Sequence, residues 1–176
     1  MPALLLLGAG IHAGDRELGV EVQLYPTGVV NAVGAKIPLG DDASLTFRAG
    51  YNSADRDDNG EHADEQGGGP GVSIGYRRML FDADRGWFAG ARADVWLLEI
   101  DWIDMPGSPG ETRGTSDVIV LQPTAAIGYR QPFGKDRQWN FEPAVSLGVE
   151  WNVDTDGADV GQGLILLVGA SVSRRF

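Results

Sequence analysis

Apolar and polar residues alternate along most of the chain with a period of two. Trp139 to Asn152 is typical: odd positions hold Trp, Phe, Pro, Val, Leu, Val and Trp, and even positions hold Asn, Glu, Ala, Ser, Gly, Glu and Asn. A period of two predicts a β-strand whose faces have different surroundings. Helical periodicity is almost absent. The pattern predicts eight strands, at about residues 17–26, 29–38, 43–53, 71–81, 87–103, 117–131, 139–152 and 163–176.

The connections between the expected strands fall into two groups by length. The second, fourth and sixth are tight turns, whereas the third, fifth and seventh are longer, with the first a short exception. An up-and-down meander places alternate connections at opposite ends of the sheet. Short turns at one end and longer loops at the other are expected of a membrane-spanning β-barrel.

The two faces of these strands carry different residues. One parity is apolar, as in Leu18, Val20, Val22 and Leu24, and no charged side chain interrupts it before the strand ends. The other parity is mostly Gly, Ser, Ala, Thr, Asn and Gln. It also carries isolated charges at Glu21, Lys36, Arg48, Arg77, Arg92, Asp94, Arg130, Glu142 and Glu150.

Small polar residues suit the crowded lumen of an eight-stranded barrel, which is just wide enough for side chains. The cations and anions would neutralise one another there, since unpaired charge is costly inside a protein. We therefore expect the apolar set to face lipid and the charged set to form an ionic network in the lumen. A soluble lipid-binding barrel would have the reverse arrangement.

Aromatic residues gather near the strand ends. The long-loop ends carry Tyr25, Tyr51, Trp102 and Trp151, and the short-turn ends carry Trp87, Tyr129, Trp139 and Phe176, with Phe81 and Phe133 nearby. Aromatic rings are enriched at both interfaces of a membrane, because they are amphipathic. We therefore expect two aromatic belts.

Two details do not fit a regular barrel. In the fifth segment the apolar residues change parity after Leu97, so we expect a β-bulge near Leu97–Leu98 that keeps Glu99 and Asp101 away from lipid. Pro123 and Pro143 lie within expected strands, although a closed barrel has no free edge to accommodate proline.

Composition narrows the class of protein. The chain has 176 residues, a formal net charge of −11 and no cysteine. No basic stripe is present, so we expect no nucleic-acid partner. The N-terminal PALLLLGAGIHAG resembles the second half of a secretory signal peptide with cleavage after Ala13. We therefore divide the chain into a signal segment, 1–13, and a barrel domain, 14–176.

Together these features resemble the small eight-stranded outer-membrane proteins of the OmpA transmembrane-domain and OmpX type. The resemblance covers nearly all of 14–176 and includes a last strand, VGASVSRRF, that ends on an aromatic residue, Phe176. It implies an all-β, eight-stranded antiparallel up-and-down transmembrane barrel in the outer membrane of a Gram-negative bacterium. It also implies contact with outer-membrane lipid and lipopolysaccharide, and recognition of the last strand by the barrel-assembly machinery. Arg174 stands where that family usually has a second aromatic residue.

Catalysis and conduction are not expected. Some small outer-membrane lipid A deacylases and acyltransferases use Ser–His chemistry, but the histidines here are His12, in the expected signal segment, and His62, in an acidic loop. Nothing in the sequence orients His62 toward a serine. Eight strands also leave a lumen filled by side chains, so we expect no large pore.

The acidic loop contains the first half of a calcium-binding pattern. Asp55, Asp57, Asn59 and Glu61 occupy the alternate positions that supply ligands in an EF-hand loop, and Gly60 follows Asn59. The twelfth position holds Gln66 in place of Glu, and no flanking helices are expected. The alternative is a hydrated outer loop without an ion.

The pattern leaves three functional hypotheses. The first is a monomeric, non-catalytic outer-membrane barrel with a structural or surface-interacting role. The second is a soluble secreted barrel that binds a small apolar ligand inside. The third is an adhesion or host-interaction barrel whose acidic outer loops contact the partner.

Overall fold

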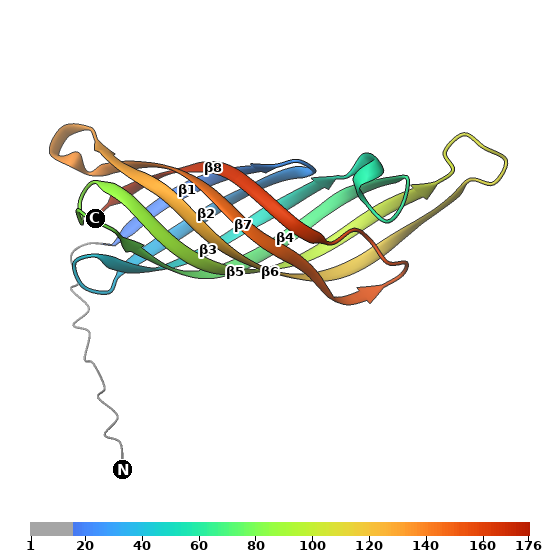
Figure 1. Cartoon of the computed structure of the whole chain (residues 1–176), viewed down its shortest axis with the longest axis horizontal. Helices are drawn as coiled ribbons and strands as arrows, with labels where there is room; N and C mark the ends of the chain where they lie inside the picture. The colour runs from blue at the N-terminus through green and yellow to red at the C-terminus, as the bar shows by residue number, and fades with distance from the viewer. Residues whose placement is uncertain (1–15) are drawn as a thin grey trace, which may run out of the picture.

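The computed structural model describes residues 16–176, which form one closed barrel of eight antiparallel strands in chain order (Figure 1). The strands are β1 Glu17–Tyr25, β2 Gly28–Pro38, β3 Ala43–Asp55, β4 Asp64–Met79, β5 Gly86–Asp104, β6 Thr112–Phe133, β7 Trp139–Asp156 and β8 Gly163–Arg175. Two short 3-10 helices, η1 Asp57–Asn59 and η2 Lys135–Arg137, lie in connections. The expected fold class is confirmed. The expected signal segment lies outside the described residues.

The barrel closes because β1 pairs with β8 as well as with β2. The closing ladder runs from the Glu17–Arg175 pair to the Leu24–Val168 pair. Every strand therefore has two hydrogen-bonded neighbours, which leaves no exposed sheet edge along the barrel wall.

The connections are sorted between the two ends of the barrel, as the sequence predicts. The turns 39–42, 80–85 and 134–138 lie at one end, with the C-terminus, and we call this the turn end (Figure 1). The connections 26–27, 56–63, 105–111 and 157–162 lie at the other, the loop end. The β5–β6 hairpin projects furthest at the loop end (Figure 1).

The strand β4 begins seven residues earlier than the sequence pattern indicates. The added segment contains Gly67, Gly68 and Gly69, which show no alternation because they have no side chain. Their smallness is required by the packing. A Cβ atom at Gly67 or Gly69 would overlap a carbonyl oxygen of the neighbouring strand β5.

The expected bulge near Leu97–Leu98 is wrong. The ladders of β5 with β4 and β6 keep one register through this point. Leu97 faces outward and Leu98 is buried in the lumen, so the regular alternation continues. The ladder irregularity lies instead between β6 and β7, at Ile119–Val120.

The prolines within strands occupy gaps in the hydrogen-bond ladder. The β6–β7 ladder passes from the Leu121–Trp151 pair to the Thr124–Gly148 pair and so omits the pair that contains Pro123. It likewise omits the pair that contains Pro143. The missing N–H groups of both prolines therefore fall on one seam, where the rest of the ladder holds the strands together.

Within residues 16–176, no helix is long and apolar enough to cross a membrane.

Candidate functional site

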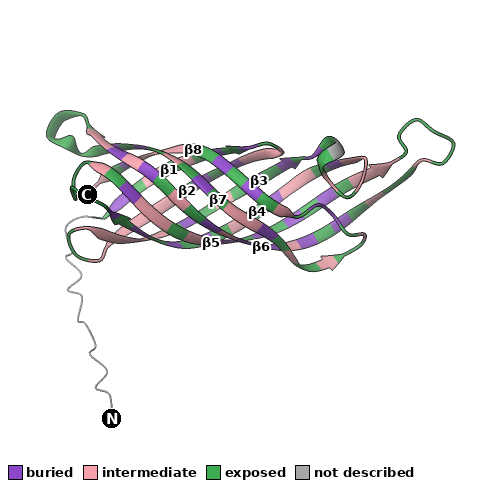
Figure 2. Ribbon diagram, viewed as in Figure 1, coloured by how far each residue is buried: buried purple, intermediate pink, exposed green. Residues whose placement is uncertain are grey.

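The outer wall of the barrel is apolar through most of its length. Exposed and buried residues alternate along the strands, as Figure 2 shows. The exposed set includes Leu18, Val20, Val22, Leu24, Val33, Phe47, Val72, Ile74, Tyr76, Val95, Leu97, Ile127, Val145, Leu147, Leu166 and Val168. Large apolar side chains that surround a molecule on all sides are stable in hydrocarbon and costly in water.

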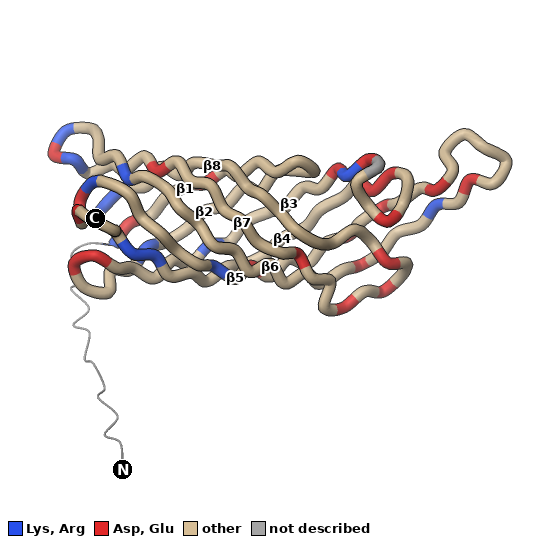
Figure 3. The backbone as a smooth tube through the Cα atoms, in the orientation of Figure 1, with Lys and Arg blue, Asp and Glu red and all other residues tan. Residues whose placement is uncertain are grey.

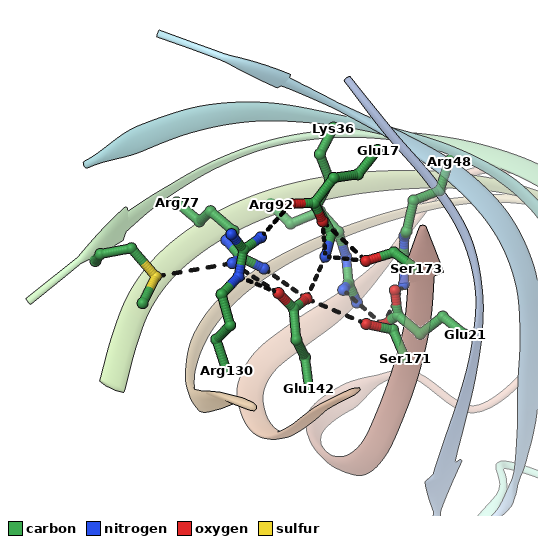
Figure 4. A network of polar contacts seen from close by, with 11 residues as sticks. Glu17, Glu21, Lys36, Arg48, Arg77, Arg92, Arg130, Glu142, Ser171 and Ser173 are labelled. Carbon is green, nitrogen blue, oxygen red and sulfur yellow. Dashed lines mark hydrogen bonds and ion pairs between the residues drawn. The ribbon is translucent and has the colours of Figure 1, made fainter. Parts of the chain in front are cut away.

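The lumen near the turn end contains an ionic network centred on Glu142 (Figure 4). Arg77 donates two hydrogen bonds to Glu142, from Nη1 to Oε2 at 2.7 Å and from Nη2 to Oε1 at 2.9 Å. Arg130 Nε donates to the same Oε1 at 2.7 Å, and the Lys36 ammonium also pairs with Glu142. Glu17 accepts a second bond from Arg130, at 2.8 Å.

A second cluster lies next to the first along the lumen. Arg48 pairs with Glu21 at 2.8 Å and with Asp94 at 2.6 Å. Arg92 pairs with the other oxygen of Asp94 at 2.7 Å. All of these side chains lie at inward-facing positions, so Arg48 of β3 meets anions of β1 and β5, which are not its neighbours in the barrel, inside the lumen.

All nine charged residues predicted for the lumen network lie on the inner face. Eight of them belong to the two clusters, whereas Glu150 lies toward the loop end, 3.7 Å from Arg56. The sequence reasoning missed Glu17, which completes the first cluster. Glu17 shares the parity of Glu21, and that parity was the available signal.

The lumen near the loop end is apolar. Eleven buried residues form one cluster there: Tyr25, Val30, Ala54, Trp96, Leu98, Ile100, Val118, Val120, Val160, Ile165 and Leu167. Trp96, Ile100 and Leu167 are almost completely buried, and Trp96 Nε1 donates to Gln122 Oε1 at 2.8 Å. We call this cluster the apolar plug, because its members come from six of the eight strands and from the β7–β8 connection and meet inside the barrel.

At the loop end the outer face of the barrel is charged, whereas the rest of the outer wall is apolar. Glu99 lies opposite Asp117, and Asp101 lies opposite Thr115, all exposed on the outside of β5 and β6. The bulge that was expected to keep Glu99 and Asp101 away from lipid is absent, and both residues lie on the outer face beyond the apolar wall. Beyond the apolar wall the barrel has an apolar interior and a charged exterior, as a water-soluble β-barrel has. Figure 3 shows acidic residues in the strands and connections at this end.

The loops above the apolar plug are tied together by Glu65. This fully buried carboxylate accepts hydrogen bonds from Arg56 Nη1 at 3.0 Å and from the backbone N–H groups of Glu61, at 2.6 Å, and Gly161, at 3.0 Å. Glu65 lies opposite Trp102, beyond the apolar wall. Burial alone would raise the pKa of Glu65, but the hydrogen bonds from Gly161 and Arg56 outweigh it and lower that pKa.

His62 adds a second tie at the loop end. Its ring stacks on Trp102 with the centroids 4.2 Å apart. Nδ1 lies 2.9 Å from Asp104 Oδ2, and Nε2 lies 2.9 Å from the carbonyl oxygen of Asp159. His62 therefore links the β3–β4 connection to the end of β5 and to the β7–β8 connection. His12 lies outside the described residues.

The aromatic residues near the turn end face outward, as expected for a belt. Trp87, Trp139 and Phe176 are exposed, and Tyr129 packs edge-on against Trp87. Phe133 also packs near Trp139. These rings lie where the apolar wall ends.

At the loop end only two of the four expected belt residues face outward. Tyr51 and Trp151 are half exposed, but Tyr25 is 8 % exposed and its hydroxyl donates to Asn52 Oδ1 at 2.6 Å. Trp102 packs against the apolar plug. For Tyr25 and Trp102 the belt assignment is wrong, because both have the inward parity of their strands and the lumen is apolar at this level.

The acidic loop gathers a different set of carboxylates from the one predicted. Asp55 and Asp57 lie together with Asp64, with one oxygen of each within 4.8 Å of the others. Asn59 ends η1, and Glu61 donates its backbone N–H to Glu65. The strands β3 and β4 flank the loop in place of the helices of an EF-hand. Calcium binding stays a prediction.

The described part of the chain has two notable cavities, and charged residues line both. One, of about 110 Å³, lies in the lumen and is lined in part by Glu21, Lys36 and Arg48. The other, of about 560 Å³, opens at the turn end beside Glu17 and Arg130. Apolar side chains such as Phe88, Ala126 and Ala144 complete the lining of the first cavity.

Comparison with known proteins identifies the fold. No family model and no curated protein matches the sequence. A major outer membrane protein from Thermus thermophilus is similar in structure with a TM-score of 0.60, at 13% identity over 94% of this chain and 100% of that chain. Neisserial surface protein A is similar with a TM-score of 0.50, at 12% identity over 92% of this chain and 95% of that chain. The chain has the fold of the small outer-membrane β-barrels. The resemblance noted in the sequence is confirmed at the level of the fold.

Proposed function

We propose that the protein is an integral outer-membrane β-barrel with a structural or surface-interacting role, without catalysis and without a large pore. The observation that carries this proposal is the distribution of polarity. The exterior is apolar around the whole circumference, and the charged residues at the same level are paired inside. This arrangement is stable only where the surroundings are hydrocarbon.

The charged exterior of the loop end supports an orientation of the barrel in which this end projects from the membrane. The acidic exterior formed by Glu99, Asp101 and Asp117 suits water, so the loop end projects from the membrane. Short turns face the periplasm and longer connections face outward in barrels of this kind. The loop end is then extracellular.

The absence of a large pore is proposed from the packing of the lumen. Trp96, Ile100 and Leu167 close the loop-end half with apolar side chains. The ion pairs of Glu142 and Asp94 cross the turn-end half. An ion would have to displace both layers, so steady large openings in planar bilayers would contradict the proposal.

A non-catalytic role is proposed from the environment of the described histidine. Both ring nitrogens of His62 are engaged by Asp104 and the Asp159 carbonyl, and no described serine lies in hydrogen-bond contact with the ring. A Ser–His pair needs that contact to activate the hydroxyl.

Membrane fractionation with protease treatment of intact cells tests the proposal. We expect to find the chain in the outer-membrane fraction and to extract it only with detergent. On gels, the unboiled protein should show a lower apparent mass than the boiled protein. Cleavage should occur in 105–111, the tip of the β5–β6 hairpin, and spare the turns at 80–85 and 134–138. Recovery in the soluble fraction without detergent would refute it.

The loop end favours adhesion as a second candidate role. The exposed acidic residues of the β5–β6 hairpin form a projecting surface that a cationic partner would complement. Replacing Glu99, Asp101 and Asp117 by their amides should leave insertion intact and abolish attachment to a cationic surface. Unchanged attachment would remove this candidate.

A further inference from the structure

A cation lies between two aromatic rings on the outer surface at the turn end. Arg174 has the same parity on β8 as Val168 and Val172, so its side chain points out from the wall. Its guanidinium carbon lies 5.8 Å from the ring centre of Trp139 and 5.2 Å from that of Phe176. Such contacts attract the guanidinium to the aromatic faces and limit its motion.

Arg174 has no anionic partner within residues 16–176. Its side chain donates a long hydrogen bond, 3.4 Å, to Gln138 Oε1 and forms no ion pair. Neighbouring arginines at this end differ, because Arg78 pairs with Asp42 at 2.8 Å and Arg175 with Asp84 at 3.6 Å. A guanidinium beside two aromatic rings, with N–H groups that meet no anion of the described residues, is suited to an anion from outside the chain.

The position of Arg174 indicates which anion it meets. Its ladder partners are Leu18 on β1 and Trp139 on β7. Leu18 is the first exposed apolar residue of its strand, so Arg174 lies at the edge of the apolar wall. The nearby turn carries Lys135, Asp136 and Arg137 and so has a net positive charge (Figure 3). Lipid headgroups lie at this level of a membrane barrel.

We infer that Arg174 binds the phosphate of a phospholipid headgroup in the leaflet around the turn end. This rests on the proposed function, since a soluble barrel would present Arg174 to water. The planar guanidinium donates two parallel N–H groups to the phosphate oxygens. Trp139 and Phe176 contact the glycerol and the first acyl carbons, and the chains continue along Leu18. This continuity from cation to apolar wall favours a lipid over a soluble anion.

Native mass spectrometry of the full chain tests the site. The protein is inserted in phosphatidylcholine bilayers containing a minority of phosphatidylglycerol, and the phosphatidylglycerol molecules that remain bound after release are counted. We expect Arg174→Gln to weaken this retention about tenfold, because a charge-assisted pair is lost. Arg174→Lys should give an intermediate loss, since it keeps the charge without the planar fork. Trp139→Leu should also reduce retention.

Arg78→Gln is the matched control, because Arg78 is exposed at the same end but paired with Asp42. It should retain the lipid as the wild type does. Equal retention by the wild type and Arg174→Gln would overturn the inference, as would an equal loss in Arg78→Gln. Displacement of the lipid by millimolar inorganic phosphate would also overturn it and would assign the site to a soluble anion.

The heat-dependent gel shift of every variant separates this inference from the proposed function. If the wild type fails to insert into bilayers, the proposed function fails and the lipid site with it. If all variants insert and shift alike but retention does not depend on Arg174, only the lipid site fails.

Discussion

Arg77 and Glu142 form a doubly hydrogen-bonded ion pair across the lumen, although their strands, β4 and β7, are not neighbours in the barrel. The pair therefore connects two parts of the wall that no backbone ladder joins. Because Glu142 also neutralises Arg130 and Lys36, its loss leaves those two cations with Glu17 and leaves Arg77 without an ion-pair partner among the described residues.

We expect Glu142→Gln to be strongly destabilising, by about 3–5 kcal/mol, because it leaves buried charges uncompensated. Urea unfolding of the barrel in lipid vesicles measures the loss. The control is Glu99→Gln, which removes an exposed carboxylate outside the network and should leave the unfolding midpoint unchanged. Similar midpoints for Glu142→Gln and wild type would show that the network does not stabilise the barrel.

The apolar plug should contribute to stability as an ordinary protein core does. We expect Leu167→Ala to cost about 2–5 kcal/mol, because Leu167 is fully buried and the plug cannot collapse around the cavity. The adjacent Leu166 points into lipid, so Leu166→Ala should cost less. Equal losses at the two positions, measured by the same urea unfolding, would contradict a packed plug.

The strands could be predicted from the sequence because successive side chains of a strand point to opposite faces, so the difference between lumen and outer wall repeats along the chain with a period of two. The inward and outward assignment also held over the apolar wall, where Leu18 to Leu24 face out and Glu21 faces in. The sequence pattern was clear there, because positions that face lipid carry no charged side chain.

The loop end could not be predicted in the same way, because its polarity is reversed. Leu98 and Ile100 were interpreted as lipid-facing after a bulge, but they fill the apolar plug, and Glu99 faces water outside. The rule that apolar residues face outward holds over the apolar wall, but it fails at the loop end, where the barrel leaves the membrane. Contacts such as Glu65 with Gly161 depend on loops far apart in sequence and leave no periodic signal.

The apolar wall leads to a prediction about a charge placed on the outer surface of the barrel. Val168→Arg should hinder insertion and cost about 2–4 kcal/mol, the range for a cation on the lipid face of a barrel near the bilayer centre. Thr115→Arg is the control, because Thr115 is exposed on β6 beyond the wall, opposite Asp101. Folding yield into vesicles, read from the gel shift, should fall only for Val168→Arg. Normal insertion of that variant would argue against lipid contact at β8.

The Glu65 tie predicts that the loops open in acid. The folded-state pKa of Glu65 is lowered, so its stabilising contribution is present above the ordinary glutamate pKa and is lost as the pH falls through the lowered value. Pepsin cleavage of 56–63 and 157–162 should therefore rise as the pH falls through the acid range, after correction for the activity of pepsin itself. Glu65→Gln should show high cleavage throughout. A variant that keeps the wild-type pH profile would exclude Glu65 as the titrating group.

The acidic loop makes a prediction about calcium. If Asp55, Asp57 and Asp64 hold an ion, millimolar Ca²⁺ should raise the melting temperature and release or absorb heat in calorimetry, because ligand binding to the folded state stabilises it. Asp57→Asn should abolish both effects by removing one carboxylate. Asp82→Asn, in the turn at the opposite end, is the matched control and should respond to Ca²⁺ as the wild type does. The absence of any response in the wild type would show that the loop is a hydrated acidic surface without an ion.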